Sequence, residues 1–278
     1  VLTSFAELEH SKERGITLVN SSNLAEYSPP IKLQNLAGGM WVPEVIKIDQ
    51  RHAIKMFAQW LYETKNIEFQ FATQVDAIDA PFVETTTETL EANSIIVCGG
   101  DELETLFPDA LESEGVIRCQ LQMLRTHPQP EGWRLGPFIL GGLSIGRYAG
   151  FQECDGIAEL KRQLEDRYPV HIENGINAIA VQELDGSVTI GDSHKYGKHF
   201  SPDRSEEADR LILDYLSERI DLANPGIADR WLGHYAFHPH ADIIDIEPQP
   251  NVRLVTMTNG QGMTHGLAIA EKNIRNLL

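Results

Sequence analysis

The sequence predicts two combined fold classes: an α/β region of the kind that binds nucleotides, and an α+β region built on an antiparallel sheet. Three observations lead to this prediction. A helix followed by strands occupies residues 49–98 and closes on a glycine pair. From about residue 115 to 240, strands and helices follow one another irregularly. A last strand then leads through a glycine-rich loop into a last helix, within residues 253–278.

The α/β region begins with a helix after Asp49. An aspartate at this position can cap a helix, because its side-chain oxygen accepts from the free N–H groups of the first turn. Apolar residues then recur at helical spacing as far as Asn66. Apolar and alternating runs predict strands at 67–71, 75–78, 83–87 and 94–98. The last of these strands runs directly into Gly99–Gly100.

The central region contains a hairpin and two helices. Strands are expected at 176–182 and 187–190, because Asp185–Gly186 between them is a strong hairpin signal. One helix is expected over 156–168. Ser205 caps another, whose apolar residues between 211 and 220 lie on one side. The final strand is expected at 253–257 and the final helix at 268–278.

The charge balance excludes two classes of partner. The 278 residues carry a net charge of −18, with 23 basic residues scattered among 41 acidic ones. Binding to a phosphate backbone needs clustered Lys and Arg, so we expect neither a nucleic-acid partner nor an anionic membrane surface. No apolar run reaches the roughly 20 residues that span a bilayer. The partner expected is a small molecule, and the oligomeric state stays open.

The cysteines predict the compartment. Cys98, Cys119 and Cys154 are far apart and form no C-x-x-C pair. This pattern argues against a disulfide framework or a zinc knuckle. No export signal is visible, so we expect a reducing, cytoplasmic location.

Glycines and histidines supply the candidate sites. Gly260-Gln-Gly262 separates the last strand from the last helix, so it can bind an anion or form a plain turn. His194 closes the strand that begins at residue 187, as a general base, a substrate contact or a surface histidine. Residues 238–242 hold two histidines and an aspartate, but Pro239 interrupts the strand and the spacing matches no known zinc motif. We therefore expect no metal there. The favoured interpretation is a strand whose polar residues line a cleft.

Longer motifs carry a family resemblance. They read GGMWVPE at 38–44, FQFATQV at 69–75, IIVCGG at 95–100 and NGQGMTHG at 259–266. Together they resemble FAD-dependent amine oxidoreductases of the D-amino-acid oxidase, glycine oxidase and sarcosine oxidase superfamily. The stretches RCQLQMLRT at 118–126, GWRLGP at 132–137 and IGDSH at 190–194 resemble one subgroup, found beside phosphonate-utilisation genes.

The resemblance implies a particular fold. It is a Rossmann-like FAD-binding domain, incomplete at its N-terminus, with an inserted antiparallel-sheet substrate domain. Residues 1–48 and 111–240 would belong to the substrate domain, and residues 49–110 and 241–278 to the FAD-binding domain. The G-x-G-x-x-G fingerprint that holds the FAD pyrophosphate is not found in residues 1–278. We expect it upstream of Val1, and we expect residues 1–278 alone to bind FAD weakly.

The resemblance also implies an activity. A hydride passes from an amine C–H, in an amine or amino acid such as an N-substituted aminophosphonate, to flavin N5, and water hydrolyses the resulting imine. FAD would be non-covalent, because Gly233 stands where sarcosine oxidases carry the cysteine that binds flavin. Thr264 replaces a lysine of those relatives, which leaves the electron acceptor open.

The resemblance further implies the site residues. The catalytic candidates are His194 and Tyr235. The cofactor-binding candidates are Val75, Cys98, Gly99, Gly100, Gly260, Gln261, Gly262, Met263 and Thr264. The substrate-binding candidates are Gln122, Arg147 and His234. Arg118, Arg125 and Arg134 are further candidates to bind an anionic substrate group.

Two other functions stay open at this stage. The chain could be a substrate-binding or partner module that never holds FAD, or a metal-dependent hydrolase that uses His238 and His240.

Overall fold

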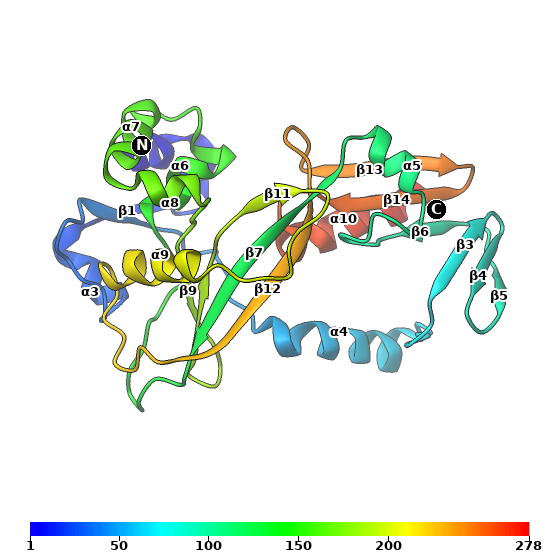
Figure 1. The fold of residues 1–278 in the computed structure, drawn as a ribbon, viewed down its shortest axis with the longest axis horizontal. Helices are drawn as coiled ribbons and strands as arrows, with labels where there is room; N and C mark the ends of the chain where they lie inside the picture. The colour runs from blue at the N-terminus through cyan, green and yellow to red at the C-terminus, as the bar shows by residue number, and fades with distance from the viewer. Residues whose placement is uncertain (278) are drawn as a thin grey trace. The chain divides into compact units, whose positions relative to one another are not determined.

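The computed structural model describes residues 1–277, and these form two compact units (Figure 1). Unit 1 consists of residues 1–58, 121–195 and 202–233, and unit 2 of residues 59–120, 196–201 and 234–278. Each unit is described by itself. The predicted domain boundaries at residues 48, 110 and 240 stay a prediction.

A six-stranded sheet forms the centre of unit 1. Its order is β11-β7-β10-β9-β8, and β12 pairs with β7. The strands are β7 (Ile117–Thr126), β8 (Ile139–Leu140), β9 (Ile179–Gln182), β10 (Val188–Gly191), β11 (Lys195–Gly197) and β12 (Ile227–Phe237). Strands β9 and β10 pair antiparallel around the Asp185–Gly186 turn, with Val188 opposite Gln182. The predicted hairpin is therefore confirmed. Parts of β7, β11 and β12 belong to unit 2 by residue number.

Helix α9 (Glu206–Ser217) supplies the other side of the unit 1 core. Ser205 caps it as predicted, because its Oγ accepts from the Ala208 N–H at 3.2 Å. The helix buries Ile212 and Tyr215 completely, in one cluster with Leu124 and Ile190 of the sheet. Burial of this apolar surface is the main force that holds helix and sheet together.

The remaining elements of unit 1 are short. Strands β1 (Thr17–Asn20) and β2 (Gly38–Trp41) form a separate antiparallel pair. The helices are α1 (Leu2–Glu7), α2 (Glu9–Glu13), α3 (Leu24–Tyr27), α6 (Gly142–Arg147), α7 (Ile157–Arg167) and α8 (Pro169–Glu173). The helix predicted at 156–168 corresponds to α7.

Unit 2 contains a three-stranded sheet in the order β13-β14-β6. Its strands are β6 (Ile95–Val97), β13 (Ile243–Gln249) and β14 (Val252–Met257). Strand β14 is antiparallel to β13 and parallel to β6, with Leu254 opposite Val97. The strands expected at 94–98 and 253–257 are therefore both present, and they share one sheet. Their side chains form one buried cluster with Leu111, Ala236 and Ile244.

A second small sheet completes the strands of unit 2. It consists of β3 (Val75–Asp79), β4 (Phe82–Thr85) and β5 (Thr89–Glu91), all antiparallel. The Gln249 side chain of β13 forms hydrogen bonds between this sheet and the β13-β14-β6 sheet. Its Nε2 donates to Ile78 O at 3.1 Å, and its Oε1 accepts from Ala80 N. Unit 2 also contains α5 (Pro108–Ser113) and α10 (Gly262–Leu277).

Helix α4 (Gln50–Lys65) confirms the first predicted helix, and Asp49 Oδ1 accepts from Arg51 N at its start. None of its side chains is buried. Ile54, Met56 and Trp60 are among its exposed apolar residues. No helix within residues 1–277 has the length and apolar character to cross a membrane.

Two sequence predictions of elements were wrong. Residues 67–71 do not form a strand, because left-handed residues flank them, Asn66 at φ 54° and Ala72 at φ 56°. The rings of Phe69 and Phe71 instead stack at 5.5 Å. The last helix begins at Gly262 and not at 268, because the glycines near its start hide its apolar period. Its predicted last residue, 278, lies outside the described residues.

Candidate functional site

Two glycine loops lie at one edge of the unit 2 sheet. Gly99–Gly100 follows β6, and residues 258–261 follow β14. Because these two strands are parallel neighbours, both loops leave the sheet at its carboxyl edge. A hydrogen bond of 2.8 Å from Thr256 Oγ1 of β14 to Gly100 O holds the first loop against the neighbouring strand. In open α/β sheets, this edge is where nucleotide ligands bind.

The loop after β14 presents the start of α10. Gln261 N donates to Asn259 Oδ1 at 3.1 Å, and Gln261 O accepts from Thr264 N and His265 N. The first turn of any helix leaves N–H groups without an intrahelical acceptor, here those of Gly262 and Met263. No acidic side chain stands in this turn. The helix start is therefore suited to an electron-rich ligand group.

Tyr235 of β12 lies against this loop. A Cβ built on Gly260 would come within 3.2 Å of the Tyr235 ring, and Gly260 has φ 75°. Strand β12 also pairs with this loop, because Phe237 and Asn259 form an isolated β-bridge. Glycine is required at 260 both by its backbone conformation and by the close approach of the ring. The structure thus brings one catalytic candidate beside the predicted cofactor loop.

His194 lies in a buried polar cluster of unit 1. Its Nδ1 is 2.9 Å from the carbonyl oxygen of Gly175, and its Nε2 is 3.6 Å from Asp192 Oδ2. Burial, and secondly the charge of Arg147, lower the pKa of His194 to about 3. The imidazole is therefore neutral at physiological pH. His194 belongs to unit 1 and Tyr235 to unit 2, and the joint catalytic role of the two residues stays a prediction.

Asp192 is a residue that sequence reasoning missed. Its burial raises the pKa of its carboxyl to about 7, although Arg147 and a hydrogen bond from Asn177 act in the opposite direction. Its backbone exchanges hydrogen bonds of 2.6 and 2.8 Å with Asn177. Its Oδ1 is buried and has no hydrogen-bond partner within residues 1–277. The one sequence signal was its position two residues before His194.

Two substrate candidates are engaged in side-chain hydrogen bonds. The amide of Gln122 donates to Ser205 O at 2.9 Å and to Asp209 at 2.8 Å, and it accepts from Ser205 N at 2.5 Å. His234 Nε2 lies 3.1 Å from Gln120 Nε2. Because an amide NH₂ only donates, the histidine accepts at Nε2. The contacts of Gln122 favour a structural role, and both substrate assignments stay predictions.

The arginine candidates occupy different surroundings. Arg118 pairs with Glu104, and Arg125 pairs with Asp229 at 2.7 Å. Arg134 is exposed. Arg147, at the end of α6, is the one whose charge acts on both Asp192 and His194. Arg147 is half-buried, and of these four arginines it is the one near enough for its charge to act on the buried Asp192 and His194.

The two remaining cofactor candidates lie at different places in unit 2. Cys98 is exposed and directly precedes Gly99 of the first loop. Val75 opens β3, in the other sheet of unit 2. Their roles stay predictions.

The histidine cluster has no arrangement suited to a metal. The rings of His238 and His240 meet edge to face at 6.0 Å, and His238 Nδ1 accepts from His240 N at 3.1 Å. No group of three or more His, Cys, Asp or Glu side chains that could hold a metal is found in the described part of the chain.

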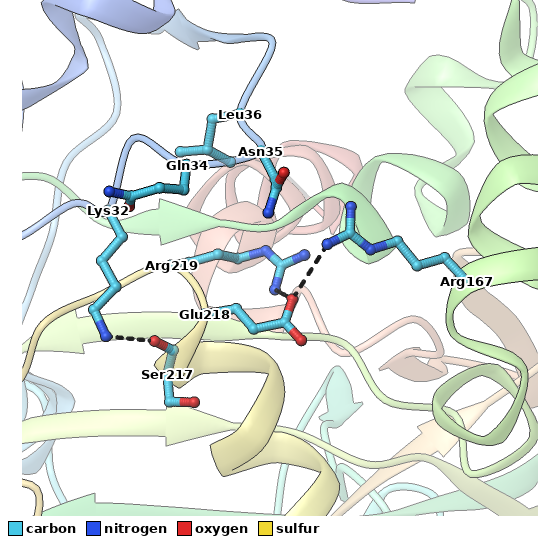
Figure 2. Close-up of a pocket in the computed structure, with 8 residues that line it drawn as sticks. All are labelled: Lys32, Gln34, Asn35, Leu36, Arg167, Ser217, Glu218 and Arg219. Carbon is cyan, nitrogen blue, oxygen red and sulfur yellow. Dashed lines mark hydrogen bonds and ion pairs between the residues drawn. The ribbon is translucent and has the colours of Figure 1, made fainter.

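A cavity of about 400 Å³ in unit 1 is lined in part by three cations: Lys32, Arg167 and Arg219 (Figure 2). Two of them bind backbone carbonyl oxygens in the last turn of α9. Lys32 Nζ donates to Ser217 O at 2.8 Å, and Arg219 donates to Tyr215 O at 2.6 Å. Cations at the carboxyl end of a helix satisfy its last carbonyls. A structural role therefore accounts for these two contacts.

Comparisons with known proteins agree with the fold. The profile of the family described as "DAO: FAD dependent oxidoreductase" matches residues 2–272. No curated protein matches the chain.

Solved structures similar to this chain include L-proline dehydrogenase from P. horikoshii, with 16% identity over 90% of this chain and a TM-score of 0.65. Glycine oxidase from Geobacillus kaustophilus has 13% identity over 95% of this chain and a TM-score of 0.63. The L-α-glycerophosphate oxidase from Mycoplasma pneumoniae, solved with FAD bound, has 16% identity over 98% and a TM-score of 0.63. The chain covers 60%, 68% and 69% of these three chains. At such identities the likeness concerns the fold.

Proposed function

The chain belongs to the DAO family of FAD-dependent oxidoreductases, and we propose that it oxidises a small amine or amino acid to an imine. One observation carries the proposal. Two glycine loops leave the unit 2 sheet at the carboxyl edge of its parallel strands β6 and β14, with Tyr235 against the second loop. The enzymes named among the solved structures include a proline dehydrogenase and a glycine oxidase.

The residues at this edge fit the flavin cofactor. A Cβ at Gly100 would meet nothing within 4 Å, so the backbone there is open to a ligand. Gly262 and Met263 N–H groups would hold an electron-rich flavin oxygen at the start of α10. FAD, when bound, supplies the acceptor for the hydride that leaves the amine carbon. Since residue 233 is glycine, the attachment is non-covalent.

The family resemblance, and not the placement of one unit against the other, supports the following roles of side chains. Tyr235 donates a hydrogen bond that orients the amine beside the loop. Arg147 attracts an anionic group of the substrate, because a guanidinium matches the geometry of carboxylate and phosphonate oxygens. His194 orients the substrate from the neutral state that its burial imposes.

The substrate class proposed is an N-substituted aminophosphonate. Its support is the resemblance of residues 118–126, 132–137 and 190–194 to the subgroup found beside phosphonate-utilisation genes, together with the half-buried Arg147, whose charge acts on Asp192 and His194. We assign the protein to the cytoplasm on the basis of its cysteine pattern.

We also propose that the working protein includes a dinucleotide-binding βαβ unit that pairs with β6. Strand β6 lies at the edge of its sheet although Ile95 and Val97 are buried and apolar. On α10, Met263, Leu267 and Ile274 share one helical face and are exposed. Such surfaces usually have a partner.

The experiment is anaerobic reduction of flavin in protein expressed from the whole reading frame. A matched pair of substrates, N-methylglycine and N-methylaminomethylphosphonate, differs only in its anionic group. Bleaching of the flavin absorbance by either amine supports amine oxidation, and faster bleaching by the phosphonate supports the substrate class. Protein that purifies without flavin and does not take it up would contradict the proposal and favour the non-catalytic module.

A further inference from the structure

The cavity beside the end of α9 contains more positive charge than the structural role of its residues requires. Three cations line it, and Glu218 is the one carboxylate in the lining among residues 1–277 (Figure 2). The chain as a whole has a net charge of −18, so a local excess of cations marks a place where an anion is attracted. All lining residues belong to unit 1, and none is a predicted catalytic, cofactor-binding or substrate-binding residue.

Glu218 and Arg219 form a fixed pair on one wall of this cavity. Glu218 Oε2 accepts from Tyr168 OH at 2.8 Å and from Arg219 Nη1 at 3.3 Å. Arg219 also donates from Nη2 to Tyr168 OH at 2.8 Å, and its side chain is only 16% exposed. The charge of Glu218 is therefore balanced within this wall, and Arg167 and Lys32 supply the surplus positive charge.

Arg167 presents its guanidinium at the end of α7. Its Nη2 lies 3.7 Å from Glu218 Oε2, which is beyond hydrogen-bond distance. Its Cζ lies 5.2 Å from the centroid of the Tyr168 ring, and this stacking orients the planar group. Arg167 donates no hydrogen bond to another residue of the described chain, and half of its side chain is exposed. Its N–H groups are therefore available to a ligand.

The loop over residues 30–36 forms another wall, and backbone contacts hold it in place. Lys32 N donates to Arg219 O at 2.7 Å, and Ile31 forms an isolated β-bridge with Ile220. Asn35 has a left-handed backbone with φ 62°, and its amide points into the cavity on the side of the two arginines (Figure 2). The donors of this wall are therefore positioned before any ligand binds.

Lys32 keeps donors in reserve. Its Nζ uses one of three N–H groups for Ser217 O at 2.8 Å. Asp221 Oδ1 lies 3.9 Å from Nζ on a side chain that is 79% exposed, so water weakens this ion pair. Lys32 can thus bind an anion without giving up its contact with α9.

We propose that this cavity is a binding site for a small organic phosphate, whose phosphate group binds Arg167, Lys32 and Asn35. These donors come from two separate segments and differ in direction. A phosphate offers three acceptor oxygens and up to two negative charges, whereas a planar carboxylate is matched best by one guanidinium. The volume of about 400 Å³ lies in the range of small-molecule sites, so an organic body fits beside the phosphate. The inference is independent of the proposed oxidation of an amine.

The first test measures binding by isothermal titration calorimetry in protein expressed from the whole reading frame. FAD is present in excess, so that the probes cannot enter the flavin site. The probes are ribose 5-phosphate, ribose and succinate. We expect ribose 5-phosphate to bind at least about 10-fold more tightly than either of the others, because only the phosphate reaches all the donors. Equal binding of ribose or succinate, or no binding of ribose 5-phosphate, overturns the inference.

A matched pair of variants locates the site. Arg167→Gln should weaken the binding of ribose 5-phosphate about 10-fold, the equivalent of one charge-assisted hydrogen bond. The control Arg162→Gln removes the same charge from the same helix, but Arg162 pairs with Glu159 and Asp166 and does not line the cavity. It should leave the affinity unchanged. An equal loss in both variants would show that only net charge matters, and the inference would fail.

A further measurement needs no variant and no turnover. In ¹⁵N-labelled wild-type protein with excess FAD, ribose 5-phosphate should shift the backbone amide signals of residues 32–36 and 217–219. Amide shifts confined to the glycine loop at 259–264 would place the phosphate elsewhere and overturn the inference.

Discussion

Replacing Gly175 by alanine tests how closely the backbone packs against His194. Gly175 has φ 62°, and a Cβ built there would lie 2.6 Å from His194 O and 3.1 Å from His194 N. The left-handed conformation alone costs about 1–2 kcal/mol for a non-glycine residue. The clash with a backbone carbonyl, which cannot rotate away, adds about 1–3 kcal/mol. We therefore expect Gly175→Ala to lower the free energy of unfolding by about 2–5 kcal/mol.

Gly132→Ala is the matched control. Gly132 has φ 85°, belongs to the same unit, and a Cβ there would meet nothing within 4 Å. Gly132→Ala should lower the free energy of unfolding only by the cost of the left-handed conformation, about 1–2 kcal/mol. The assay is urea denaturation followed by circular dichroism. Both variants are compared with the same m value, the slope of the free energy of unfolding against urea concentration. If the two variants lose the same free energy within ~0.5 kcal/mol, the close approach of Gly175 to His194 is refuted.

Three further predictions concern other sites. Ser205→Ala should lower the free energy of unfolding by about 1 kcal/mol in the same urea assay, because it removes the cap of α9. Arg51 holds the pKa of Asp49 at about 2, below the ordinary 3.8, so this stabilisation is present above pH 4 and is lost as the pH falls towards 2. Thermal unfolding at pH 6 and pH 3 should show that Asp49→Asn lacks this part of the acid sensitivity. Tyr235→Phe in flavin-containing protein should slow anaerobic flavin reduction about 10-fold, the equivalent of one hydrogen bond, without changing the flavin content. An unchanged rate would remove Tyr235 from the proposed mechanism.

Local signals predicted much of the fold. The Asp185–Gly186 turn and the Ser205 cap each act over a few residues, so the hairpin and α9 could be predicted from the chain itself. The pairing of β6 with β14 joins residues more than 150 positions apart. The family resemblance assigned both segments to one domain, but only the structure shows that these strands are neighbours. The strand at 67–71 failed because alternation shows which side chains could be buried together. It does not show whether a partner strand is available, and two left-handed residues bend the chain away.

The candidate site was predictable to a smaller extent. The family resemblance named both the glycine loop at 260–262 and Tyr235 as site residues. The structure shows that they lie against each other. Asp192 could not be identified, because its chemistry depends on burial by residues from α6 and from the loop before β9. A sequence shows a carboxyl next to a serine, but not the loss of water that raises its pKa.

The interleaving of the two units has a consequence for how the chain folds during synthesis. Neither unit is one continuous stretch, and the chain passes between them five times. Unit 1 lacks part of its sheet until β12 has been made, and unit 2 lacks β13, β14 and α10 until the last segment, 234–278, emerges. Many larger proteins fold one domain at a time during synthesis. This chain cannot do so, because neither unit is complete until late segments have been made. Early strands such as β6 and β7 wait with unpaired edges, and we expect the yield of folded protein to depend on slow translation and on chaperones that shield nascent apolar strands.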